Sequence, residues 1–401
     1  MLVLCAPDLA RAGTEEFSTF DIARQEEDDE SLLDHLLTRS PRSWRDAWER
    51  STLAFRTEQG CLTSGQWLIH SALKVETPLG DKAQFGVFLR QSQDDIASYD
   101  YLDLSARFPT RAGRLGVAFR PFHDKSRQDF ALMWETGADT SALQVQAVFG
   151  LEDLFNNLWA FRQTRVGDLS EPYVKHPFEP ALRVVTRHPH WRTNLEMQYL
   201  TPSTQRLSGD TDLDPRRIST LWGTLAHASV EYRAKGFAWE ALSRNQQAFS
   251  SAAPEGAPFG DNGNFRRQWS VESAVRHPLP RRLSAEARVL YQDRDQHHSP
   301  PTGPGAFGAI DRTLGAELQW EALPRLTARL GGLYDRISVA RSGLEFRPSY
   351  GTRTESRAYF GLVARFGSVA LSIVEGIELD PEPYDVWGVH DKGFFHLQAI
   401  F

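Results

Sequence analysis

The chain has 401 residues, of which 41% are hydrophobic and 24% are charged. It contains no run of about 18 consecutive apolar residues, so a transmembrane helix is excluded. The formal net charge of −7 argues against a nucleic-acid partner, because such partners select basic surfaces.

The first twelve residues have the pattern of a clipped signal peptide. Leu2-Val3-Leu4-Cys5-Ala6 forms a short apolar core, and Ala10-Arg11-Ala12 fits the small-x-small rule for cleavage before Gly13. We therefore predict that residues 1–12 are a signal peptide remnant. Cleavage would leave Cys61 as the only cysteine, whereas an uncleaved chain leaves a Cys5–Cys61 bridge open.

Residues 13–50 differ in character from everything that follows. An acidic run at 26–30 precedes Ser31-Leu32-Leu33-Asp34-His35-Leu36-Leu37, whose leucines form one helical stripe that Pro41 ends. Trp44 and Trp48, four residues apart, indicate a second short helix. We predict a short helical N-terminal extension that packs against the rim of the following domain. The alternative is a plug that enters that domain.

From Ser51 onward, apolar and polar side chains alternate along short stretches. In 283–292, Leu283, Ala285 and Val289 share one face, while Glu286 and Arg288 occupy the other. The same pattern recurs at 102–108, 192–199, 268–276 and 314–321. A period of two is typical of strands with one apolar and one polar face. Strands of this kind build transmembrane barrels without raising the mean hydropathy of the chain.

The connections between these stretches alternate between short and long. The short ones lie around Pro78-Leu79-Gly80, Pro109-Thr110, Gly137-Ala138, Pro189-His190, Lys235-Gly236, Pro278-Leu279-Pro280, Pro324 and Gly367-Ser368. The long polar ones span 201–219, 247–267, 293–309, 339–356 and 380–393. This rhythm is typical of up-and-down barrels with tight periplasmic turns and larger outer loops. We predict an all-β, antiparallel transmembrane β-barrel over 51–401, with about 18 strands (roughly 16 to 20) of about 9 to 11 residues and both termini periplasmic.

Aromatic residues gather near the predicted strand ends. They are Trp67, Tyr99, Phe108, Trp134, Tyr199, Trp222, Phe237, Trp239, Tyr291, Trp320, Tyr334 and Phe366. Aromatic side chains at the ends of apolar bands form the girdles that hold a barrel at the membrane interfaces.

The last eight residues have the pattern of a terminal strand. Phe395, Leu397, Ala399 and Phe401 share one face, and the chain ends on an aromatic residue. This octet resembles the C-terminal signal strand of bacterial outer-membrane β-barrels. The resemblance implies that Phe395, Leu397 and Phe401 form an assembly signal for the barrel-assembly machinery, and that the protein resides in the bacterial outer membrane. Taken alone, the octet also fits the final strand of a soluble sandwich.

The polar faces of the predicted strands carry many charges of both signs. The residues that we predict to line the lumen are Arg107, Arg114, Arg120, Arg183, Arg187, Glu196, Arg233, Arg244, Glu272, Arg276, Glu286, Arg288, Glu317 and Arg329. Unpaired charges in this number require water, and barrels of this size leave an aqueous channel. An arginine excess would favour anionic solutes, whereas cross-strand Arg–Glu pairing, which we prefer, would neutralise the wall.

The longest connection, about 150–180, carries an apolar face of its own. Phe155, Trp159 and Phe161 stand at helical spacing within it. A loop of this length must bury that face somewhere. We predict that these aromatic residues form a constriction inside the barrel or contact a partner.

Motifs for catalysis or cofactor attachment are missing from the sequence. There is no Cys-x-x-Cys-His, no Gly-x-x-x-x-Gly-Lys, no His-Glu-x-x-His and no Gly-x-Ser-x-Gly. His188 with His190, and His297 with His298, are the only close histidine groups, and both fall in predicted connections. We expect neither a metal nor another cofactor, and we expect that the protein is not an enzyme.

These patterns lead to one preferred function and two alternatives. We predict a water-filled pore for passive diffusion of ions or small polar solutes. The chain resembles porins in architecture over 51–401, although no residue-level porin motif is present. A second interpretation is a barrel sheath that encloses a partner such as a multihaem c-type cytochrome, as in porin–cytochrome conduits. A third is an outer-membrane hydrolase.

Overall fold

The structure is a computed structural model that describes most of the chain after Ser51. The described residues are 51–61, 67–79, 83–94, 98–119, 130–136, 141–151, 169–175, 178–208, 217–254, 263–298, 305–342, 349–379 and 392–401. Within them, the strands form one 19-stranded sheet. No helix in these ranges is long and apolar enough to cross a membrane. The predicted signal peptide remnant and the extension at 13–50 lie outside the described residues.

The strands fall into two groups by length. The shorter ones are β1 (Leu53–Cys61), β2 (Trp67–Leu79), β3 (Ala83–Asp94), β4 (Ser98–Thr110), β5 (Gly113–Phe119), β6 (Phe130–Thr136), β7 (Leu143–Leu151), β8 (Leu169–Lys175), β9 (Phe178–Arg187), β18 (Val369–Glu378) and β19 (Lys392–Ile400). The longer ones are β10 (Trp191–Ser208), β11 (Arg217–Ala234), β12 (Phe237–Pro254), β13 (Gly263–Leu279), β14 (Leu283–His298), β15 (Gly305–Leu323), β16 (Leu326–Ser342) and β17 (Ser349–Phe366).

Apart from β8, which β7 skips to pair with β9, consecutive strands pair antiparallel, and the sheet closes on itself through β1 and β19. β8 and β9 share one position in the ring: β9 pairs with 192–198 of β10 and with β7, whereas β8 pairs with 204–208 of β10. Counting these two strands as one gives 18 positions, in agreement with the prediction. The β10 ladder shifts register between Leu200 and Ser203, where Pro202 has no N–H to donate.

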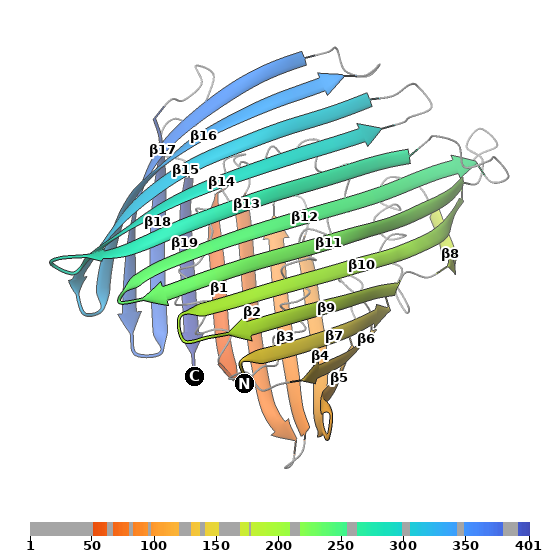
Figure 1. The fold of residues 1–401 in the computed structure, drawn as a ribbon, viewed down its shortest axis with the longest axis horizontal. Helices are drawn as coiled ribbons and strands as arrows, with labels where there is room; N and C mark the ends of the chain where they lie inside the picture. The colour runs from red at the N-terminus through yellow and green to blue at the C-terminus, as the bar shows by residue number, and fades with distance from the viewer. Residues whose placement is uncertain are drawn as a thin grey trace.

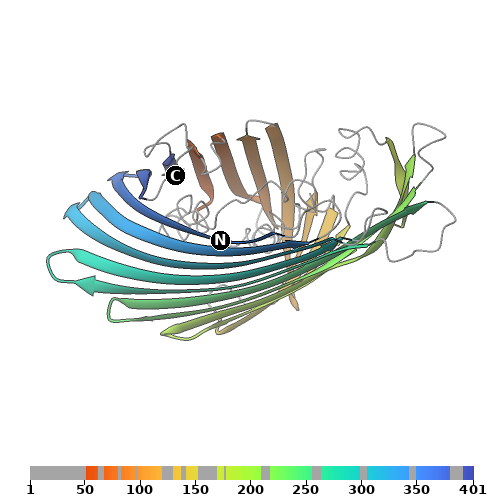
Figure 2. The ribbon, with the colours of Figure 1, turned by 90° about the horizontal axis from the view of Figure 1, so that it is seen from above.

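The long strands form one broad wall of the barrel. β10–β17 have 16 to 19 residues each, whereas β1–β7 have 7 to 13. Figure 1 shows this wall running obliquely in front of β1–β5, and Figure 2 shows the same strands curving together along one side of the molecule. The prediction of about 9 to 11 residues per strand is wrong for these eight strands.

The extra length comes from segments that were predicted to be loops. The connections 201–219, 247–267, 293–309 and 339–356 shrink to 209–216, 255–262, 299–304 and 343–348 because the flanking strands continue into them. The predicted connection at 150–180 likewise contains β8 and the start of β9. These segments carry polar residues on both faces, so the alternation of apolar and polar residues is lost while the backbone ladder continues.

At the opposite end, which we call the turn side, the strands join through tight hairpins. The connections there have 2 to 6 residues, as in β11–β12, where Lys235 and Gly236 both have positive φ angles of 50° and 83°. Two successive positive φ values define a type I′ turn, whose twist matches that of the flanking strands. Gly236 supplies the second of these without steric cost. The other end is called the loop side.

Large apolar side chains are exposed on the outer face near the turn side. Leu132, Leu195, Met197, Leu314 and Leu330 are 50 to 65% exposed. Aromatic residues border this apolar band on both sides, as in β10, where Trp191 and Tyr199 lie eight residues apart. Eight residues span about 26 Å along a strand, before tilt is subtracted. Beyond Tyr291 and Tyr334 towards the loop side, the outward positions become polar or charged.

Candidate functional site on the inner wall

The side chains opposite the apolar band are polar and buried. Glu196, between the exposed Leu195 and Met197, is 2% exposed, and Asp335, beside the exposed Tyr334, is fully buried. Because successive residues of a strand point to opposite faces, these groups lie on the inner wall. Three clusters of contacts account for most of the sequence-predicted residues near the turn side, and we name them by their central residues: Glu317, Arg288 and Glu135.

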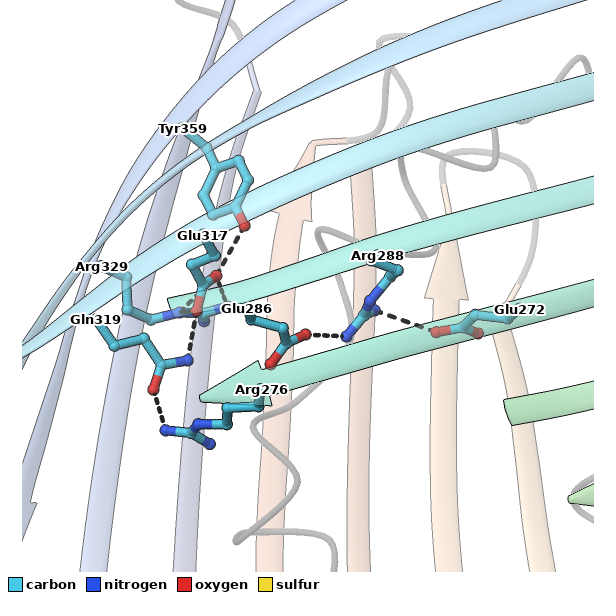
Figure 3. A network of polar contacts seen from close by, with 8 residues as sticks. All are labelled: Glu272, Arg276, Glu286, Arg288, Glu317, Gln319, Arg329 and Tyr359. Atoms are coloured by element: carbon cyan, nitrogen blue, oxygen red, sulfur yellow. Dashed lines mark hydrogen bonds and ion pairs between the residues drawn. The ribbon is translucent and has the colours of Figure 1, made fainter. Parts of the chain in front are cut away.

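The Glu317 cluster joins three strands through one carboxylate. Glu317 of β15 accepts hydrogen bonds from Arg329 of β16, at 2.6 Å from Nη2 and 3.1 Å from Nε, and from the hydroxyl of Tyr359 of β17, at 2.7 Å. Gln319 also donates to Glu317 and accepts a hydrogen bond from Arg276 of β13 (Figure 3). The carboxylate is buried, and these charge-assisted bonds replace its lost hydration.

A glycine makes room for the tyrosine in this cluster. Gly331 lies directly opposite Tyr359 in the β16–β17 ladder. A Cβ atom at Gly331 would fall 2.2 Å from Cζ of Tyr359, so the ring lies over the glycine backbone. This packing places the tyrosine hydroxyl within reach of Glu317, one strand further on.

In the Arg288 cluster, one guanidinium group compensates the negative charges of neighbouring carboxylates. Glu286 of β14 lies directly opposite Glu317 of β15, and like charges in such pairs repel. Arg288 lies between Glu286, at 2.6 Å from Nη2, and Glu272 of β13, at 3.4 Å from Nη1 (Figure 3). Arginine suits this place because its planar guanidinium presents several donors to two acceptors at once.

The Glu135 cluster lies in the part of the ring formed by β5–β9. Arg114 of β5 pairs with Glu135 of β6 at 2.8 Å. Gln144 of β7 donates to the same carboxylate and accepts a hydrogen bond of 2.7 Å from Arg187 of β9. Glu135 is buried at 4% exposure, and these contacts compensate the hydration that its charge has lost.

The remaining predicted lumen residues are placed as follows. Arg183 donates to Asn194 at 2.8 Å, Arg107 is buried, and Arg244 is partly buried. Glu196 accepts a hydrogen bond of 2.8 Å from Gln198 and lies 3.9 Å from His227. Arg233 is exposed at the turn side and lies 3.7 Å from Glu231. Arg120 lies outside the described residues. That these residues line a solute path stays a prediction.

Of the predicted loop and assembly residues, the structure describes only those of assembly. Phe155, Trp159 and Phe161 lie outside the described residues, so their role as a constriction stays a prediction. Phe395 and Leu397 are partly buried in β19, and Phe401 is 69% exposed. The Phe401 N–H donates to the carbonyl of Leu53 at 3.0 Å, so the last residue belongs to the closing seam.

The predicted histidine groups make local contacts in the structure. His190 Nδ1 lies 3.1 Å from the carbonyl oxygen of Arg233, and His297 lies 3.1 Å from Asp295. Within the described ranges, no group of three or more His, Cys, Asp or Glu residues is placed to hold a metal ion.

Sequence reasoning missed the neutral members of the clusters and one acid. Gln144, Gln319 and Tyr359 were not among the predicted residues, and neither was Glu135. A signal for two of them is present in the alternation of the strands. Gln319 lies two residues from Glu317, and Tyr359 lies two residues from Arg357, so each shares the face of a charged residue.

A closed ring with exposed apolar side chains outside and buried charges inside reverses the arrangement of a soluble protein. Its exposed apolar band requires lipid, and the closed ladder leaves no unpaired edge within that band. The chain folds as a closed antiparallel transmembrane β-barrel, the architecture of bacterial outer-membrane proteins.

Comparisons with known proteins give similarity of fold alone. No family model matches the sequence, and no curated protein matches it. A bacterial polysaccharide outer membrane secretin is 13% identical, with 87% of this chain and 97% of that chain covered and a TM-score of 0.42. OccAB1 of Acinetobacter baumannii is 8% identical, with 86% and 95% covered and a TM-score of 0.44. CdiB of Escherichia coli is 14% identical with a TM-score of 0.44, and the alignment covers 87% of this chain and 63% of that chain.

Proposed function

We propose that the barrel is a passive channel for ions and small polar solutes across the bacterial outer membrane. The observation that carries this proposal is the charged inner wall at the level of the outer apolar band. Glu196 points inward between two residues of that band, Glu317 lies six residues from the turn-side end of β15, and Arg288 lies five residues from that of β14. The Glu135 cluster lies at the turn-side ends of its strands. A wall of this polarity suits water and dissolved ions.

The pairing of charges argues for weak selectivity. Arg329 pairs with Glu317, Arg114 with Glu135, and Arg288 with two glutamates. Paired charges of opposite sign create little net potential at a distance. We therefore propose a non-enzymatic channel that admits both cations and anions, with the tight turns and both termini in the periplasm.

Planar bilayer recordings test the proposal. The full chain, purified gently in detergent, is expected to insert and give steady conductance with a reversal potential near zero in a salt gradient. Haem absorbance of the same preparation is recorded before insertion. A barrel without conductance that copurifies with a haem protein would overturn the channel and support the sheath. Hydrolysis of lipid or ester substrates by a non-conducting barrel would instead support the hydrolase.

A further inference from the structure

Two arginines lie side by side on the outer face, just beyond the apolar band. Arg312 of β15 is directly opposite Arg336 of β16, and both side chains are exposed. The next outward positions towards the turn side are Leu314 and Tyr334, which are 53% and 43% exposed. The pair therefore lies where hydrocarbon gives way to lipid headgroups, on the loop side of the barrel.

The described residues do not compensate these two charges. Within the described part of the chain, neither Arg312 nor Arg336 makes a hydrogen bond or an ion pair. Their outer cross-strand neighbours are Tyr291 on β14 and Thr354 on β17, which bring no negative charge. Like charges directly opposite each other in a sheet are destabilising. A bound anion would remove this repulsion.

A groove adjoins the pair on its loop side. It has a volume of about 520 Å³ and includes Ile310 and Ser338, the next outward positions beyond the two arginines. Asp293 and Asp295 of β14 also line the groove. Gly308, which has no side chain, lies in it as well. Two guanidinium groups beside a shallow groove that includes Asp293, Asp295 and Ser338 match a phosphate attached to a hydroxyl-bearing group.

We propose that Arg312, Arg336 and this groove bind the phosphorylated headgroup of a lipid in the leaflet on the loop side. The guanidinium pair holds the phosphate, and the acyl chains continue along the apolar band past Leu314 and Tyr334. The groove receives the sugar or other polar part of the headgroup, whose hydroxyl groups donate to the two aspartates. This inference does not depend on whether the lumen conducts.

Native mass spectrometry of the full chain in detergent tests the site with lipid A, a bisphosphorylated glycolipid, as the probe. The double variant Arg312→Gln/Arg336→Gln is expected to bind lipid A at least about tenfold more weakly than the unmodified protein, because it loses two charge-assisted contacts. The variant Arg312→Lys/Arg336→Lys keeps both charges and is expected to lose less. Equal binding by the glutamine variant and the unmodified protein would overturn the proposal.

The matched control removes the same charge at the other end of the barrel. Arg281 and Arg282 are adjacent, exposed and located in the β13–β14 turn. Arg281→Gln/Arg282→Gln is expected to bind lipid A like the unmodified protein, and an equal loss there would contradict the assignment. Inorganic phosphate is added in a separate titration. If it displaces lipid A at equal concentration, the site recognises free phosphate and the lipid proposal fails.

Discussion

Glu317 illustrates how a single inner-wall carboxylate depends on its neighbours. It accepts hydrogen bonds from Arg329 and Tyr359, both on other strands. Glu317→Ala should lower the free energy of unfolding by about 3 kcal/mol, because it leaves the Arg329 guanidinium without its partner. Tyr359→Phe removes one hydrogen bond and should cost only about 1 kcal/mol.

Urea unfolding in lipid vesicles measures both changes. Glu321→Ala is the control, since Glu321 is an exposed residue of the same strand near the turn, and it should change stability by less than about 0.5 kcal/mol. Equal effects of Glu317→Ala and Glu321→Ala would show that the Glu317 cluster contributes nothing to stability.

Gly331 gives a second test at the scale of one residue. Gly331→Ala should destabilise the barrel, because the new methyl group meets the Tyr359 ring and displaces its hydroxyl from Glu317. The loss should shrink when Tyr359 is also replaced by alanine, as a double-mutant cycle of unfolding free energies would report. Gly351→Ala is the matched control, since a Cβ there meets nothing within 4 Å. Additive effects of the two substitutions would contradict this packing.

The neutral polar partners mark the limit of reading single residues from the sequence. Charged residues such as Glu317 and Arg288 stand out on a polar face, so they were predicted. Gln319 shares the face of Glu317 on β15, whereas β7, the strand of Gln144, carries no charged residue, so a search for charge alone passes over both. Which arginine meets which glutamate depends on the register between strands, and alternation along one strand does not specify it.

At the scale of the strand, the outward positions of the long strands fall into two zones: an apolar band near the turn side and a polar zone beyond it. Leu195 lies midway between Trp191 and Tyr199 on the outer face, whereas Thr352 of β17 lies beyond the apolar band. Leu195→Arg should cost about 2–4 kcal/mol when the barrel folds into vesicles, because the charge would lie near the middle of the bilayer. Thr352→Arg should cost about 0–1 kcal/mol. Comparable losses for the two variants would show that Leu195 does not lie deeper in the membrane than Thr352.

The strand count was predictable, and the strand lengths were not. Alternation at 192–199 and 283–292 required strands, and the short connections indicated how many there are. Beyond Leu200 and Tyr291 polar residues occupy both faces, so the sequence there looks like a loop. The continuing ladder depends on hydrogen bonds to neighbouring strands, which no local pattern records. β8, within the predicted connection at 150–180, could not be predicted for the same reason, because it too depends on pairing with a neighbouring strand.

At the scale of the whole barrel, the Arg288 cluster offers a functional test. Arg288→Gln leaves Glu272 and Glu286 without their shared cation, so the inner wall becomes more negative. In a planar bilayer with a salt gradient, the reversal potential should shift towards cation preference. Arg282→Gln, which removes a charge in an exposed turn, should produce a smaller shift. An equal shift in both variants would argue against ion passage beside Arg288.

At the closing seam, the role of a residue in assembly can be tested separately from its role in stability. β1 and β19 pair over seven positions, from Ala54 with Ile400 to Gly60 with Phe394, and Phe401 adds only one backbone hydrogen bond. Deleting Phe401 should therefore leave refolding into detergent nearly unchanged while reducing the amount of barrel inserted in cells. Immunoblotting of outer-membrane fractions beside a refolding assay checks this. An equal loss in both assays would assign Phe401 a structural role instead.

The unequal strand lengths make the entrance of this cylinder slanted. Because β10–β17 are longer than β1–β7, the described strands form a higher wall along one side of the barrel than along the other (Figure 1). A large particle that approaches from the side of β10–β17 meets the polar outer face of these long strands, whereas the described strands on the opposite side end sooner. Approach to the barrel is thus directional before any loop is considered.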